Sequence, residues 1–129
     1  MRRVWLFLLL TIGFCACGDN QSPEEAAMKV ALESYESLHE GDYEAFLNNR
    51  ADMEDAPASF REQLLVAYKQ FVRQQQELHT GITSFTVSHA QMDNSLQVMQ
   101  VFMLVNYADN TQEEILVPMV ERDGEWKMK

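Results

Sequence analysis

The stretch that decides the fold is residues 82–128, ITSFTVSHAQMDNSLQVMQVFMLVNYADNTQEEILVPMVERDGEWKM. From residue 82 to 91 apolar side chains alternate with polar ones, and this period of two is typical of a β-strand. Asp93-Asn94, Asp109-Asn110 and Asp123-Gly124 are turn signals, of which the last is the strongest hairpin signal in the chain. We therefore expect a meander of four antiparallel strands over 82–91, 96–108, 113–122 and 125–128.

The residues before Gly81 follow a helical period instead. Ser22, Pro23 and Glu25 combine a capping residue, a proline at the first helical position and a capping box. The helix that they open is predicted to end at Gly41. Asp42 can then cap a second, short helix, which presents Tyr43, Phe46 and Leu47.

A third helix is expected after a loop over 48–58. Ser59 and Glu62 repeat the capping-box pattern, and the segment ends at Gly81. Its apolar residues predict a single stripe: Phe60, Leu64, Tyr68, Phe71, Val72 and Leu78. Helices followed by a meander predict an α+β domain with the helices on one face of a four-stranded antiparallel sheet.

The first residues predict an exported lipoprotein. Arg2 and Arg3 precede an apolar run to Phe14, which is shorter than the roughly 20 residues that span a bilayer as a helix. Phe14-Cys15-Ala16-Cys17 is similar to a lipoprotein box with Phe in place of Leu. We expect residues 1–16 to be a signal peptide, 17–22 an acylated cysteine with its tether, and 23–129 the folded domain.

The predicted location is the cell envelope. Gly18 follows Cys17 where an aspartate often retains lipoproteins at the inner membrane, so delivery to the outer membrane is favoured. Both cysteines lie within residues 1–17. The folded part therefore offers no thiol for a disulfide, a metal or a nucleophile.

The chain is strongly acidic, with ten Lys and Arg against twenty Asp and Glu and a net charge of −10. Loss of Arg2 and Arg3 with the signal peptide would leave eight basic residues against the same twenty acidic ones. Such a surface repels phosphate backbones, which argues against nucleic-acid binding. It also repels anionic lipid headgroups, so membrane attachment would rest on the acyl chains of Cys17.

Two segments carry a resemblance to a known family: residues 23–46, PEEAAMKVALESYESLHEGDYEAF, and residues 114–129, EILVPMVERDGEWKMK. With the order of elements, they resemble the nuclear transport factor 2-like superfamily, also called cystatin-like or SnoaL-like. The closest resemblance is to its small bacterial lipoproteins of unassigned function. It implies a curved sheet wrapped around a long helix, forming a cone with an internal pocket. The superfamily includes isomerases, dehydratases and transport adaptors, so the fold does not fix the function.

The strand positions that could face such a pocket lack catalytic groups. Residues 96–106 contain no acid and no histidine, and the acids of 113–122 lie at its ends. His89 is the weak candidate for a base, with a histidine at the strand rim as the alternative. His39 and His79 fall near helix C-termini, which explains both. No histidine stands at the spacing of a metal ligand from another histidine or from an acidic residue, so no metal or cofactor is expected.

Aromatic and thioether side chains supply the pocket candidates, although core packing is the favoured role for side chains of these types at this spacing. They are Tyr35, Phe46, Tyr68, Met103 and Tyr107.

The strand over 96–108 is apolar on both faces, and a second apolar face needs cover from a homodimer packed sheet to sheet or from a partner protein. Pro118 indicates a sheet edge or a bulge.

These patterns favour a lipid-anchored, non-catalytic envelope domain that binds a partner protein or a small apolar ligand. One alternative is an isomerase or dehydratase that uses His89 and a tyrosine in the cone pocket. Another is an acidic inhibitor or immunity-type protein that masks a basic partner.

Overall fold

The computed structural model describes residues 21–129. Cys17 and the predicted signal peptide lie outside these residues. The elements are α2 (Pro23–Glu40), α3 (Tyr43–Asn48), the short 3-10 helix η1 (Ala51–Met53), α4 (Ala58–His79), β1 (Ile82–Asp93), β2 (Val98–Tyr107), β3 (Gln112–Arg122) and β4 (Glu125–Met128). Within the described part of the chain, no helix has both the length and the apolar character needed to cross a membrane.

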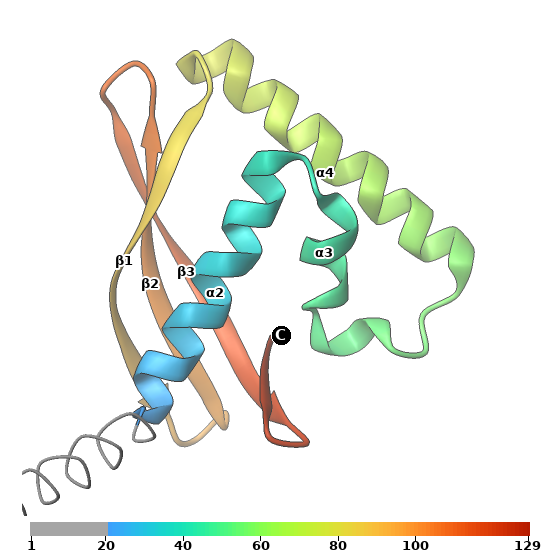
Figure 1. Cartoon of the computed structure of the whole chain (residues 1–129), viewed down its shortest axis with the longest axis vertical. Coiled ribbons are helices and arrows are strands. Elements are labelled where there is room, and N and C mark those ends of the chain that lie inside the picture. Colours follow the sequence, from blue (N-terminus) through green and yellow to red (C-terminus); the bar gives the residue numbers. More distant parts are fainter. Residues whose placement is uncertain (1–20) are drawn as a thin grey trace, which may run out of the picture.

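The four strands form one antiparallel sheet in the order β1-β2-β3-β4. The helices cover one face of this sheet, with α2 lying along it and α3 and α4 farther out (Figure 1). The predicted α+β class, strand number and meander are therefore confirmed. The element that the sequence missed is η1, which lies within the predicted loop 48–58.

The opening helix forms as its end signals predict. The Ser22 hydroxyl accepts from the Glu25 backbone N–H at 3.1 Å, and the Glu25 carboxylate accepts from the Ser22 N–H at 3.2 Å. Gly41, with φ 89°, ends the helix in the left-handed conformation that glycine adopts without strain. The buried face of α2 consists of Ala27, Ala31, Ser34 and Leu38. Its small residues let the helix axis lie close to the sheet.

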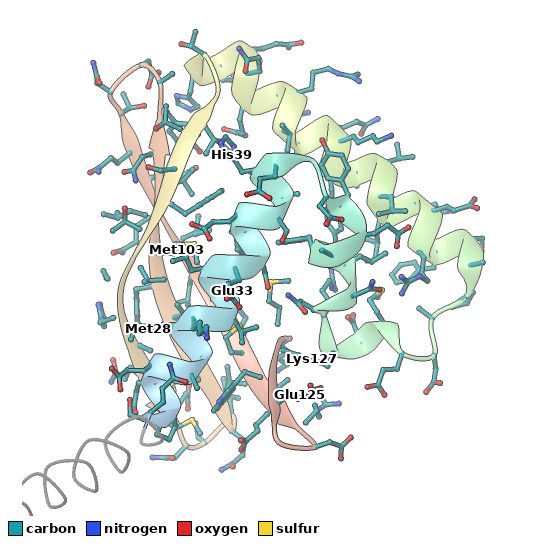
Figure 2. All side chains as sticks on the ribbon, in the orientation of Figure 1. Met28, Glu33, His39, Met103, Glu125 and Lys127 are labelled. Carbon is teal, nitrogen blue, oxygen red and sulfur yellow. The ribbon has the colours of Figure 1, made fainter. Side chains whose placement is uncertain are left out.

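The interior of the cone is filled by side chains. Odd-numbered residues of β2 point toward α2 and are buried, while even-numbered ones face outward and are half-buried beyond Val98. Met99, Met103 and Met119 are each at most 1% exposed in a core that includes Ala27 and Ala31. Figure 2 places Met103 between the sheet and α2. The central part of the cone is therefore a packed core.

A short chain of hydrogen bonds fastens α2 to the last strand. The Ser34 hydroxyl donates to the Val30 carbonyl at 2.7 Å and accepts from the Asn49 amide at 2.8 Å. The Asn49 carbonyl in turn accepts from the Met128 N–H at 2.7 Å. Ser34 is fully buried, so its hydroxyl must be paired within the protein.

We expect Ser34→Ala to lower the free energy of unfolding by about 2 kcal/mol, because it removes the acceptor of the Asn49 amide. Urea denaturation of the domain lacking residues 1–17 measures the loss. Ser37→Ala is the matched control, since Ser37 also donates to a carbonyl of its own helix but is more exposed. Its effect should stay within about 0.5 kcal/mol. An equal loss of unfolding free energy in the two variants would contradict the stabilising role of the Ser34 hydroxyl.

The third predicted helix is present, but two predictions about α4 are wrong. It begins at Ala58 after Pro57, with no side-chain cap, so Ser59 lies inside the first turn and forms no capping box. The apolar residues also do not share one buried face. None of the 22 described residues of α4 is buried, and Phe60 and Leu78 are 41% and 71% exposed.

Candidate functional site

Three predicted pocket residues meet where the helices converge. Tyr35 on α2, Phe46 on α3 and Tyr68 on α4 form a continuous aromatic cluster. The ring centroids of Tyr35 and Phe46 lie 5.0 Å apart and those of Phe46 and Tyr68 lie 4.9 Å apart, both edge to face. This is a favourable geometry for aromatic pairs, and it holds the three helices together.

Arg50, in the loop after α3, caps this cluster. Its Nη1 donates to the Tyr68 hydroxyl at 3.1 Å, while Nε and Nη2 donate to the two carboxylate oxygens of Asp52 at 3.1 and 2.9 Å. The Arg50 hydrogen bond lowers the pKa of Asp52, and burial raises the pKa of Tyr35. Arg50 was not identified from the sequence because it lies in a predicted loop. The only local feature that points to its role is an acidic residue, Asp52, two positions further on.

A small cavity opens beside the cluster, at the mouth of the cone. Its volume is about 110 Å³, and it is lined by Tyr35, Phe46, Arg50, Leu116, Val117, Pro118, Met128 and Lys129. The Tyr35 hydroxyl has no hydrogen-bond partner among residues 21–129, so it is free to donate. Sites for free small molecules usually measure about 300–1,000 Å³. The cavity therefore fits a single inserted side chain better than a complete small ligand.

The open edge of β3 borders this cavity. β3 pairs with β2 over residues 112–119 but with β4 only over 119–122. The Pro118 carbonyl accepts from the Lys129 N–H at 2.9 Å, which places the polar backbone groups of residue 118 on the side away from β2. Antiparallel alternation then directs those of Leu116 and Glu114 to the same side, where no strand of the described chain lies. β3 is therefore an internal strand of the sheet where β4 pairs with it and has an open edge only before Pro118, which lies at the boundary between the two parts.

The other two pocket candidates lie elsewhere. Met103 is fully buried in the core. Tyr107, at the far end of the sheet, stacks on His79 with ring centroids 4.0 Å apart and donates to the Glu113 carboxylate at 2.7 Å. His79 also contacts Asp109, with Nδ1 and Oδ2 3.1 Å apart. These contacts fasten the end of α4 to the sheet.

Burial and the hydrogen bond to Glu113 raise the pKa of Tyr107 from 10.0 to about 12. A group with a raised folded-state pKa stabilises fully below its unfolded pKa and loses that contribution as pH rises through the folded value. We therefore expect the free energy of unfolding to fall more steeply between pH 10 and 12 in the parent chain than in Tyr107→Phe. Urea denaturation at several alkaline pH values measures both slopes. The same pH dependence of the unfolding free energy in both proteins would contradict the raised pKa of Tyr107.

His89 lies outside the cone. It is exposed on the outer face of the sheet, where its ring stacks on Phe102 with centroids 4.2 Å apart and its Nδ1 lies 2.9 Å from the Ser88 hydroxyl. An irregularity between Val87 and His89 interrupts the alternation of β1 and turns His89 outward. The alternative that placed His89 as a base inside the pocket is therefore wrong. Within residues 21–129 no group of three or more acidic, histidine or cysteine residues could hold a metal ion.

Comparison with known proteins gives a likeness in structure. The chain is similar to a solved Campylobacter jejuni protein described provisionally as an NTF2-like transpeptidase, with a TM-score of 0.62 and 10% identity. The match covers 78% of this chain and 94% of that one. No family model and no curated protein matches the sequence. At this identity the likeness shows the fold alone, and the protein has the NTF2-like α+β fold that its sequence predicts.

Proposed function

We propose that this protein is a lipid-anchored, non-catalytic binding domain of the cell envelope, held at the outer membrane through Cys17. Its partner is a protein that lays an extended segment along the open edge of β3. The observation that carries the proposal is the position of this edge directly beside the cavity at the mouth of the cone. Lipid anchoring rests on the sequence of residues 1–18.

The site offers both elements of strand addition. Free backbone groups of Leu116 and Glu114 can pair with a partner strand, and the cavity can take one of its side chains. The cavity wall is mainly aromatic and aliphatic, which suits an apolar anchor residue. Glu113 and Glu114 are exposed along the same strand, so the partner segment should carry Lys or Arg near that anchor.

Binding is better supported than catalysis. The polar side chains that line the cavity are those of Tyr35, Lys129 and Arg50, and the Arg50 guanidinium is already paired with Asp52. No carboxylate or histidine side chain is among the lining residues, so none of them serves readily as a general base near neutral pH. The cavity of about 110 Å³ also favours a partner side chain over a free apolar ligand.

The test is photo-crosslinking in cells that express the full chain. A photoreactive phenylalanine at Leu116, which is 50% exposed, should give one adduct with a partner protein. The same group at the exposed Glu36 of α2 serves as the control and should give none. E114Q should weaken the adduct, because it removes a charge beside the partner strand and leaves the contact of Glu113 with Tyr107 intact. Adducts at Glu36 alone, or a yield unaffected by E114Q, would contradict the proposal.

A further inference from the structure

The apolar surface of α4 is wider than the part that its own domain covers. One row of residues faces the domain and is half-buried: Arg61, Leu65, Tyr68, Val72, Gln75 and His79. A second row runs beside it: Phe60, Leu64, Ala67, Phe71, Gln74 and Leu78. We name this second row the α4 seam. Its spacing alternates between four and three residues, which is the spacing of a coiled-coil contact.

Five of the six residues of the α4 seam are exposed, and the sixth, Leu64, is half-buried. Phe60, Phe71 and Leu78 are 41%, 39% and 71% exposed, although five of the six seam residues are apolar. Figure 1 shows why: α4 runs along the outer side of the molecule, beyond α3, and reaches the sheet only near its C-terminal end. An apolar row of this length on an otherwise acidic surface marks a contact site.

Neutral residues border the seam. Gln63 and Gln70 follow its outer side, and their amides can both donate and accept hydrogen bonds. The charged residues Glu62, Lys69, Arg73 and Glu77 lie around the helix on the far side of this glutamine border. α4 as a whole carries three basic and two acidic residues, whereas the chain carries −10. The seam thus lacks the charges that would select a strongly basic or acidic partner.

We infer that the α4 seam binds a second copy of this chain, with the two α4 helices antiparallel. A two-fold axis near residue 69 places Phe60 of one copy opposite Leu78 of the other. It places Ala67 opposite Phe71, so that a small side chain meets a large one. Gln70 lies next to its own counterpart, where the two amides can pair. The same axis places Leu64 opposite Gln74, so two of the three kinds of residue pair along the seam are apolar on both sides.

The charges favour this contact over a sheet-to-sheet dimer. Two copies of an acidic protein repel each other except where like charges are sparse. On the outer face of the sheet, the exposed Glu114 pairs with Leu104 and lies two residues from Leu116. A second copy on that face would bring these carboxylates toward each other. The α4 seam avoids this repulsion.

Disulfide trapping of the full chain, purified in detergent, tests the geometry. Gln70→Cys should give a covalent dimer under mild oxidation, because the two residues face each other across the two-fold axis. Gln76→Cys lies on the opposite side of α4 and is the matched control, expected to show only the background of the parent chain. Leu116→Cys reports a sheet-to-sheet dimer. A dimer trapped through Leu116→Cys and not through Gln70→Cys would overturn the inference.

Phe71→Glu tests the energetics. It should weaken self-association by a factor of ten or more in sedimentation experiments, because it places a carboxylate in the apolar contact. Lys69→Glu, on the charged side of α4, should leave the dissociation constant of the dimer within about threefold of that of the parent chain. Circular dichroism of each variant checks that the fold is retained. A parent chain that stays monomeric at about 100 μM, or equal effects of the two variants, would contradict the inference.

Discussion

Cys17→Ser is expected to abolish acylation of the protein in a bacterial host. Serine offers no thiolate to form the thioether, and the acidic domain has no charge-based affinity for lipid headgroups. Metabolic labelling with a palmitate analogue gives an all-or-none result. Cys15→Ser is the matched control, since Cys15 lies within the predicted signal peptide and the variant should keep the label. Label that persists in Cys17→Ser, or disappears in Cys15→Ser, would contradict the assignment.

Met103→Ala is expected to cost about 3 kcal/mol of the free energy of unfolding, because it leaves a cavity in a fully packed core. Met92→Ala applies the same chemical change to a methionine of β1 that is 38% exposed, and it should cost less than about 1 kcal/mol. Urea denaturation of the two variants compares them directly. Similar costs would mean that Met103 lines an open pocket, as one interpretation of the sequence had it.

Local signals account for most of what the sequence predicted correctly. The ends of α2 depend on Ser22, Glu25 and Gly41, whose contacts span at most four residues. The meander follows from turn residues at 93–94, 109–110 and 123–124, with strand ends within about two residues of the expected ones. These elements form because their own side chains and backbone specify them.

The wrong predictions concern features that depend on residues far away in the sequence. Helical periodicity predicted that Tyr68, Phe71 and Leu78 lie in one buried stripe. In the structure, α3 and the sheet cover the row of α4 that contains Tyr68 and leave the α4 seam, with Phe71 and Leu78, exposed. His89 was assigned to the alternation of β1, which an irregularity between residues 87 and 89 interrupts.

The candidate site was only half predictable. Tyr35, Phe46 and Tyr68 were identified as aromatics at helical spacing, and the structure brings them together. Arg50 was missed because its role depends on Tyr68, eighteen residues away. The sequence left open whether the methionines of the sheet line a pocket or fill the core, and the structure buries Met99, Met103 and Met119 in the core.

Hydrogen exchange at β3 tests the central proposal, that the open edge receives a partner strand. In the purified protein the backbone amides of Glu114 and Leu116 should exchange rapidly, while those of Glu113 and Ile115, which face β2, should be protected. In membranes that contain the partner, Glu114 and Leu116 should become protected as well. Exchange at these two amides that is the same in both preparations would contradict the proposal.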